Sequence, residues 1–268
     1  MNQTSNKKRL DIALTERGLL PSRSTSKDFI KRKQVYVNNK LIDKASFQVS
    51  DTDIIELKSK LKYVSRGALK LEKAMQVFNI NFKDKIMLDI GSSTGGFTDL
   101  ALQNNINEVI AVDVGTNQLH KSLRNNKKVS LFEQTDFRDM DTDLIRKADI
   151  ITIDVSFISV KKLIPKLSLL TNAKELVLLI KPQFECGKEA SDIYHGIILN
   201  KDIHKNVIKD LIKEFNDIHF YLKGITYSPL QGGSGNIEYL AYFTRNEVLD
   251  IDINAVVKDA FKEFQVNG

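Results

Sequence analysis

The feature that most constrains the fold is a glycine-rich turn between an apolar run and a helix-like pattern. The run KIML leads into DIGSSTGGFTDLAL, residues 89–102, which contains Gly91, Gly95 and Gly96. Glycine accepts left-handed backbone conformations, and a helix that begins after such a turn offers free N–H groups to a ligand. The pattern predicts a strand, a tight turn and a helix around a ligand, although a strand–helix connection without a ligand fits the same residues.

Two phosphate-binding motifs fail at this turn. Gly91 and Gly96 have the P-loop spacing, but Phe97 stands where that motif requires a lysine. Ser93 replaces the second glycine of the dinucleotide motif G-x-G-x-x-G. We expect Asp89 to end the strand as a carboxylate that faces the turn, which suits a ligand carrying positive charge. S-adenosylmethionine, with an ammonium and a sulfonium, is such a ligand.

The chain around and beyond this turn alternates apolar, strand-like runs with helix-like segments. Five apolar runs with helical crossovers predict a mostly parallel sheet, and two further runs predict an antiparallel pair at one edge. The sequence therefore predicts an α/β domain with a seven-stranded sheet over residues 65–268. The expected strands are IMLDI, EVIAVDV, VSLFEQT, DIITIDV, ELVLLIK, IHFYLKGITYS and NIEYLAYF.

Charged residues follow the five parallel runs, where a doubly wound sheet binds its ligands. Asp113 lies 22 residues after Gly91, a position from which a carboxylate accepts hydrogen bonds from ribose hydroxyls. Asp136 and Phe137 offer an acceptor and an apolar edge for an adenine. Taken singly, each charged residue also fits a solvated strand end. The set that predicts a polar rim over one crevice is Asp89, Asp113, Asp136, Asp154 and Lys181.

The excess positive charge lies in the first quarter of the chain. Residues 1–73 contain 17 Lys and Arg against 8 Asp and Glu, whereas the remainder contains 23 against 26. A basic module on a nearly neutral body predicts a polyanionic partner, most simply nucleic acid. A solvated charged surface is the alternative interpretation.

Composition excludes several other classes of protein. A hydrophobic content of 42% supports an ordinary core. No apolar run approaches the roughly 18 residues of a membrane helix, and the start MNQTSNKKRLDIAL lacks the apolar centre of a signal peptide. One cysteine, Cys186, leaves no internal disulfide, and the four histidines show no paired metal-ligand spacing. We expect a cytoplasmic protein with no metal and no stable membrane association.

Residues 1–57 predict a small α+β domain, followed by a linker at 58–64. We expect Ser24 to cap a basic helix, and VYVNNKLI to form a hairpin that turns at Asn38 and Asn39. The segment resembles the RNA-binding fold named after ribosomal protein S-four, through RLD at 9–11, SR at 22–23, the basic helix and VYVNNKLIDK at 35–44. It departs at Lys33, where that family usually has glycine. The expected RNA-binding residues are Arg9, Arg23, Lys27, Lys31, Arg32 and Lys33.

Five segments along nearly the whole chain resemble the hemolysin-A-like (TlyA-type) family: YVSRGALKLEKA, DIGSSTGGFTD, DVSFISV, LIKPQFECGK and SPLQGGSGNIEYL. Its members are S-adenosylmethionine-dependent rRNA 2′-O-ribose methyltransferases with an S-four-like domain and a Rossmann-like domain. The resemblance implies rRNA or ribosomal subunits as partner and cytidine as the target. The cofactor-binding residues then expected are Asp89, Gly91, Ser92, Ser93, Gly95, Gly96, Phe97, Asp113, Asp136 and Phe137.

The catalytic domain is also similar to the heat-shock rRNA ribose methyltransferases, which use a Lys-Asp-Lys-Glu tetrad. By motif, the tetrad falls on Lys70, Asp154, Lys181 and Glu238. A lysine at its reference pKa of about 10.4 is protonated, but a second lysine and burial both favour the neutral amine. We expect Lys181 to be the base and Lys70 to position the hydroxyl. Asp154 and Glu238 would then orient the two lysines.

Three alternatives remain open at the level of sequence. Cys186 near the end of the fifth strand invites comparison with thiolate-dependent carbon methylation, although a lone cysteine is more often a small buried apolar residue. A non-catalytic RNA-binding factor in ribosome assembly would retain a cofactor pocket. A membrane-active cytolysin, suggested by the family's historical name, would need an amphipathic segment that binds a surface.

Overall fold

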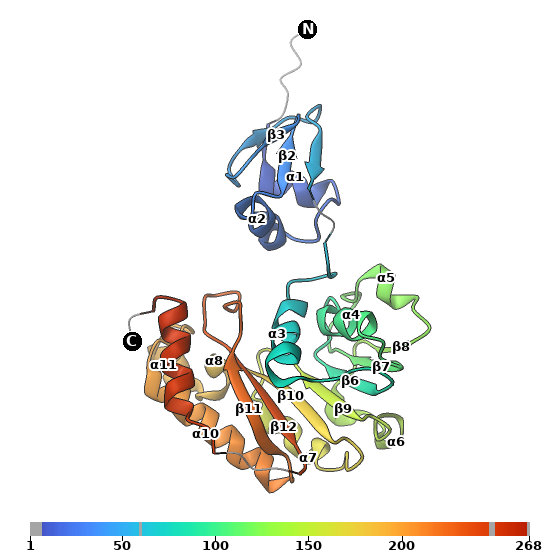
Figure 1. The fold of residues 1–268 in the computed structure, drawn as a ribbon, viewed down its shortest axis with the longest axis vertical. Helices are drawn as coiled ribbons and strands as arrows, with labels where there is room; N and C mark the ends of the chain where they lie inside the picture. Colours follow the sequence, from blue (N-terminus) through green and yellow to red (C-terminus); the bar gives the residue numbers. More distant parts are fainter. Residues whose placement is uncertain (1–6, 59–60, 247–249, 267–268) are drawn as a thin grey trace. The chain divides into compact units, whose positions relative to one another are not determined.

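The computed structural model describes residues 7–58, 61–246 and 250–266. The chain divides into two compact units, with the boundary between Arg66 and Gly67 (Figure 1). The expected linker at 58–64 falls in the first unit by this division, and its residues 59–60 lie outside the described part. Each unit is described by itself.

The N-terminal unit is a small α+β fold around an aliphatic core, as the sequence predicts. A three-stranded sheet has the order β3-β2-β5, and β1 pairs with β4. Leu10, Leu14 and Ile30 from the two helices pack with Val35 from β2. The elements are β1 Lys8–Arg9, α1 Leu10–Glu16, α2 Arg23–Lys31, β2 Val35–Val37, β3 Lys40–Leu41, β4 Gln48–Val49 and β5 Ile55–Leu57.

Two local predictions in this unit have different outcomes. The hairpin is confirmed, because Asn38 and Asn39 both have positive φ, 48° and 64°, as a two-residue turn between right-twisted strands requires. The predicted helix cap was wrong: the side chain of Ser22, not Ser24, accepts the backbone N–H of Thr25. The helix therefore begins at Arg23 and places Ser24 inside its first turn.

The C-terminal unit is built on a seven-stranded sheet, which confirms the predicted fold class. Its order is β11-β12-β10-β9-β6-β7-β8 (Figure 1). The five strands from β10 to β8 are parallel, and β12 is antiparallel to both β10 and β11. The strands are β6 Ile86–Ile90, β7 Glu108–Val112, β8 Val129–Phe132, β9 Ile150–Ile153, β10 Glu175–Ile180, β11 Tyr221–Tyr227 and β12 Tyr239–Thr244.

Successive side chains of a strand point to opposite faces of the sheet. The central strands are buried along nearly their whole length, so both faces carry apolar side chains that helices must cover. Leu88 and Ile90 of β6 belong to a buried cluster that includes side chains of α7, α10 and α11. Helices α3 and α4 pack against each other. The helices are α3 Ala68–Phe78, α4 Gly96–Gln103, α5 Lys121–Arg124, α6 Thr142–Ile145, α7 Ile164–Leu167, α8 Pro182–Glu185, α9 Lys188–Ile193, α10 Lys201–Asp217 and α11 Ile253–Glu263, with 3₁₀ turns η1 Phe137–Asp139 and η2 Val160–Leu163.

Candidate active site

Two lysine–carboxylate pairs lie at the edge where the parallel strands end, which we call the carboxyl edge. Lys181 follows β10, and its Nζ lies 2.6 Å from Oδ1 of Asp154 and 2.9 Å from Oγ of Ser156. Lys70, on the first turn of α3, places its Nζ 2.6 Å from Oε2 of Glu238. The four residues of the predicted tetrad therefore form two ion pairs, one for each lysine.

The sheet register explains why residues so far apart in the chain meet here. Ile180 and Tyr239 are the last paired residues of β10 and β12, so Lys181 and Glu238 are the next residues on neighbouring antiparallel strands. Asp154 comes directly after β9, which runs parallel to β10. The side chains of Lys70, Lys181 and Glu238 are 13%, 8% and 3% exposed. Charge at this depth is tolerable only because each group has an oppositely charged partner.

A cavity of about 330 Å³ opens at the same edge. Six of the predicted site residues line it, and the same cavity contains residues that the sequence did not single out: Val114, Gln118, Ser156, Phe157 and Ile158. Ser156 and Phe157 lie in DVSFISV, one of the segments that carry the family resemblance. That resemblance gave these two residues no role in a binding site. The predicted residues in the lining are Gly91, Ser93, Asp113, Asp136, Phe137 and Asp154.

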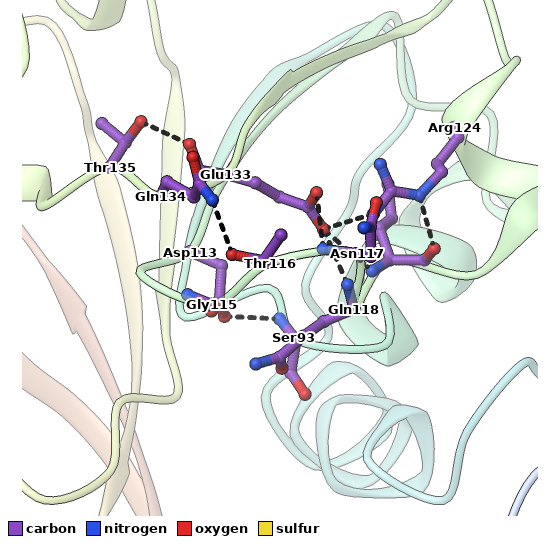
Figure 2. Close-up of polar contacts among 11 residues, drawn as sticks. Ser93, Asp113, Gly115, Thr116, Asn117, Gln118, Arg124, Glu133, Gln134 and Thr135 are labelled. Carbon is purple, nitrogen blue, oxygen red and sulfur yellow. Dashed lines mark hydrogen bonds and ion pairs between the residues drawn. The ribbon is translucent and has the colours of Figure 1, made fainter.

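Asp113 sits at the end of β7 with both carboxylate oxygens engaged by backbone (Figure 2). The N–H of Ser93 donates to Oδ2 at 2.8 Å, and the N–H of Gly115 donates to Oδ1 at 2.7 Å. Each oxygen accepts a single hydrogen bond from these amides and keeps a lone pair, because a carboxylate oxygen can accept two. The carboxylate is thereby fixed in the cavity wall with capacity left for two hydroxyl donors.

The glycine turn packs closely against neighbouring backbone. Gly91 has φ +85°, and a Cβ there would lie 2.5 Å from the carbonyl oxygen of Asp154. A Cβ on Gly95 would meet Leu119 and Leu123, whereas Phe97 is buried in α4. Ser92 has a buried Oγ without a hydrogen-bond partner among the described residues, an arrangement common where a ligand or water completes the site.

Asp89 differs from its expected placement. It lies within β6, is fully buried, and accepts hydrogen bonds from Thr98 and Thr152 at 2.7 and 2.9 Å instead of facing the turn. The strand continues through Ile90, so alternation turns Asp89 toward α4 and away from the cavity lining. Burial raises its pKa to about 6, although the two threonine hydroxyls favour the ionised form. Its observed contacts join β6, α4 and β9.

Asp136 lines the cavity but is already paired. The guanidinium of Arg138 donates to both of its carboxylate oxygens, and the backbone N–H of Arg138 donates to Oδ1. These hydrogen bonds hold the pKa of Asp136 below its ordinary value. An adenine amine would compete with a guanidinium for this acceptor, so the neighbouring buried Phe137 is the stronger candidate for an adenine contact.

The second glycine-rich segment, SPLQGGSGN, shapes the surroundings of Glu238. A Cβ on Gly232 would lie 2.6 Å from Oε1 of Glu238, whereas a Cβ on Gly233 would meet nothing within 4 Å. Gly232 therefore leaves space for the carboxylate that holds Lys70. The expected approach of these glycines to a ligand remains a prediction.

The predicted RNA-binding residues all belong to the N-terminal unit. Arg9 and Arg23 both donate to Asp11, which is completely buried. Burial opposes ionisation of Asp11, but the hydrogen bonds from the two arginines outweigh it and hold the pKa below its ordinary value. The other four residues, on or just beyond α2, are exposed: Lys27, Lys31, Arg32 and Lys33.

Three further findings bear on the alternatives. Burial raises the pKa of the Cys186 thiol, which disfavours the thiolate that carbon methylation would use. Within residues 7–58, 61–246 and 250–266, no group of three or more His, Cys, Asp or Glu is placed to hold a metal ion. In the same ranges, no helix combines the length and apolar character that crossing a bilayer requires.

The sheet order, the cavity at the carboxyl edge and the glycine turn define a methyltransferase domain. Residues 63–245 match the FtsJ-like methyltransferase family, and residues 8–55 match the S4 domain. The chain belongs to the FtsJ-like methyltransferases and, within them, to the group that includes Hemolysin A and TlyA.

Three relatives and a solved structure illustrate that membership. The Bacillus subtilis (strain 168) protein YqxC is 42% identical over 97% of this chain and 96% of its own. Hemolysin A of Brachyspira hyodysenteriae is 41% identical over 88% and 99%. The 23S rRNA (cytidine-2′-O)-methyltransferase TlyA of Campylobacter jejuni is 37% identical over 89% and 100%. A Streptococcus thermophilus structure is 40% identical over 97% of both chains, with a TM-score of 0.75.

Proposed function

We propose that this protein transfers a methyl group from S-adenosylmethionine to the 2′-hydroxyl of a ribose in rRNA, with cytidine as the target nucleotide. The observation that carries the proposal is the pair of buried, ion-paired lysines at the carboxyl edge of a methyltransferase sheet. The name of the Campylobacter relative supplies the reaction, the nucleotide and the class of RNA. A protein that modifies rRNA would work in the cytoplasm, where ribosomes assemble.

The residues around the cavity fit S-adenosylmethionine. The carboxylate of Asp113 can accept both ribose hydroxyls, and Phe137 can lie against the adenine. Of the glycine turn, Gly91 and Ser93 line the cavity, and we propose that the methionine part lies against them. The unpartnered Oγ of Ser92 is a polar group that a ligand or a bound water would satisfy. When bound, the cofactor supplies a methyl group on a positively charged sulfur.

The lysines then act on the hydroxyl of the RNA. In our proposal Lys181 gives up to solvent the proton of its ion pair with Asp154, and the free amine then accepts the hydroxyl proton on Nζ. Asp154 and Ser156 fix the direction of that amine. Lys70 positions the hydroxyl and is held by Glu238. Holding the reacting groups at attack distance supplies a further part of the acceleration.

The basic N-terminal domain supplies RNA affinity. We propose residues 1–57 as the RNA-binding domain, 58–64 as a linker and 65–268 as the catalytic domain. The exposed guanidinium groups of Arg9 and Arg23, with the lysines along α2, suit phosphate contacts. Such contacts give an affinity that falls steeply with salt. A ribose within folded rRNA is hard to reach, so the target nucleotide would be turned out of its stack.

The deciding experiment follows tritium from S-adenosylmethionine into purified ribosomal subunits and naked rRNA. We expect label on a ribose 2′-oxygen, with the rate reduced about 10²–10⁴-fold in Lys181→Ala, the range that one acid–base group contributes. Lys147→Ala is the matched control, because Lys147 pairs with Glu108 at the amino edge of the same sheet. Calorimetry should find cofactor binding intact in Lys181→Ala and weakened in Asp113→Ala.

Three other outcomes would contradict parts of this proposal. Bound cofactor without label on any RNA would favour the non-catalytic assembly factor. Label on a base would identify a different acceptor. Turnover near wild type in Lys181→Ala would remove Lys181 from the role of base.

A further inference from the structure

The segment between β7 and α5 has no regular structure, yet it carries several residues of the cavity wall. Asp113, Val114 and Gln118 all belong to it and all line the cavity. Because the segment lacks the hydrogen bonds of a helix or strand, side chains from elsewhere must hold it in place if Asp113 is to keep one position in the cavity wall.

That support is a carboxylate with no place in the function proposed above. Glu133 follows β8 directly, and its side chain points toward Asn117 and Gln118 of the segment (Figure 2). Its Oε1 accepts the N–H groups of Gln118 and Leu119 at 2.8 and 3.2 Å, and its Oε2 accepts that of Asn117 at 3.0 Å. Three successive backbone amides thus converge on one carboxylate, as they do in anion-binding nests.

Arg124 closes the arrangement from the other side. Its Nη2 donates to Oε1 of Glu133 at 2.5 Å, and its Nε donates to the carbonyl oxygen of Leu119 at 3.0 Å. The guanidinium therefore ties the carboxylate to the end of the same segment. The hydrogen bond from Arg124 is the largest of several effects that lower the pKa of Glu133 to about 2, so the carboxylate stays ionised throughout the physiological range.

Backbone pairing extends this support to the cavity. The N–H of Thr135 donates to the carbonyl oxygen of Asp113 at 3.1 Å, and that of Gln134 donates to the carbonyl oxygen of Gly115 at 3.0 Å. A Cβ on Gly115 would lie 1.9 Å from the Gln118 side chain, so this glycine lets Gln118 pack over the turn. These backbone pairs join residues 134–135, which follow Glu133, to the first part of the segment, while Glu133 itself accepts the amides of its last part.

We propose that Glu133 is a positioning residue for the cofactor: by holding the amides of residues 117–119, it fixes the wall that presents Asp113 and Gln118 and so sets the affinity for S-adenosylmethionine. The inference rests on the proposed function. Glu133 itself does not line the cavity. Its effect therefore belongs to binding more than to the methyl-transfer step.

The test is Glu133→Gln, which keeps the size of the side chain but turns one acceptor into a donor facing backbone donors. We expect the dissociation constant for S-adenosylmethionine to rise about tenfold, the size of one lost charge-assisted hydrogen bond. The KM for the cofactor should rise more than kcat falls. Without any cofactor, the amides of residues 117–119 should exchange hydrogen faster than in the wild type.

Glu108→Gln is the matched control, since Glu108 begins β7 and pairs with Lys147 at the opposite edge of the sheet. It should leave cofactor affinity and the exchange of residues 117–119 unchanged. Arg124→Lys is a milder second variant. A lysine keeps the positive charge but cannot donate to Glu133 and to the carbonyl oxygen of Leu119 in the geometry of a guanidinium. It should also raise the dissociation constant, by less than Glu133→Gln does.

The outcomes separate this inference from the function it rests on. A wild type that binds no S-adenosylmethionine would overturn the proposed function, while the exchange measurement would still report whether Glu133 holds the amides. A wild type that binds the cofactor, with equal affinity in Glu133→Gln, would overturn the inference alone. Unchanged amide exchange in both variants would also overturn it.

Discussion

The two units hold their cationic side chains in opposite ways. In the N-terminal unit, one fully buried carboxylate, Asp11, binds both Arg9 and Arg23. The side chains of these arginines remain 41% and 55% exposed. One acid thus orients two guanidinium groups while leaving them accessible to an RNA backbone.

In the catalytic unit each of the two buried lysines at the carboxyl edge has a carboxylate of its own. Lys181 pairs with Asp154 and Lys70 with Glu238, and both ammonium groups are almost excluded from solvent. Exposed cations suit binding, because a polyanion can reach them from solution. Buried cations suit chemistry, because exclusion of water strengthens every electrostatic interaction around the reacting atoms.

The largest expected effect comes from breaking a buried pair. Lys70→Met should abolish methyl transfer and lower the free energy of unfolding by about 3 kcal/mol, because it leaves the Glu238 carboxylate buried and unpaired. The double variant Lys70→Met/Glu238→Leu should recover most of the stability and none of the activity. Urea unfolding and tritium transfer measure the two quantities.

The control for this prediction is Lys147→Met/Glu108→Leu, which removes a more exposed pair at the other edge of the sheet. It should change stability by less than about 1 kcal/mol and leave activity intact. Activity in the Lys70/Glu238 double variant would show that this pair is structural only.

The shared carboxylate of the N-terminal unit should give the next largest effect. Asp11→Asn should lower stability by roughly 2 kcal/mol, since it weakens hydrogen bonds to two charged groups at a buried site. It should also weaken RNA binding, because neither Arg9 nor Arg23 would be held in one orientation by the Asp11 carboxylate. Asp28→Asn, which removes an exposed pair with Arg32, should affect stability far less.

The pH dependence of the Asp11 effect has a defined sign. The pKa of Asp11 is held below its ordinary value in the folded protein. Its stabilisation is therefore complete above the unfolded value of about 3.9 and is lost as the pH falls through the lower folded value. The difference in stability between wild type and Asp11→Asn should be constant from about pH 8 to pH 5 and shrink below about pH 4. A difference that grows on acidification would contradict the pairing.

A smaller change tests how closely the carboxylate that pairs with Lys70 must be placed. Gly232→Ala adds a methyl group 2.6 Å from Oε1 of Glu238 and should displace that side chain, lowering kcat about tenfold. Gly233→Ala meets no atom within 4 Å and should leave kcat unchanged. Equal rates in the two variants would mean that Glu238 tolerates displacement.

The smallest effect concerns a backbone position at the end of the basic helix. Lys33 has φ +57°, so Lys33→Gly should raise the stability of the N-terminal unit by about 1 kcal/mol. Lys27→Gly, in the middle of α2, should lower it by about the same amount. Amide hydrogen exchange over residues 8–55 in the full chain would measure both changes in stability. A loss of stability in Lys33→Gly would contradict the idea that the positive φ of Lys33 strains the backbone.

Local patterns in the sequence were sufficient for the strands of the large sheet and for the hairpin. Alternation and apolar runs located all seven strands of the large sheet, and Asn38–Asn39 located the hairpin, because these signals lie within a few neighbouring residues. The choice between Ser22 and Ser24 as cap was not decided by residue type. Both serines are capping residues by type, and the structure shows that Ser22 accepts the N–H of Thr25 while α2 buries Thr25, Ser26 and Ile30.

The sequence by itself determined the fold class and the family, and it correctly placed Asp113, Asp154 and Lys181 directly after strands. Only the tertiary structure decided what each charge does. Asp89 and Asp113 look alike along the chain, yet strand alternation buries the first against two threonines and places the second in the cavity wall. Glu133 carries no motif, and its role exists only because β7 and β8 lie side by side and bring three amides and Arg124 around it. A carboxylate takes its function from the donors and the solvent around it, and those are assembled from distant parts of the chain.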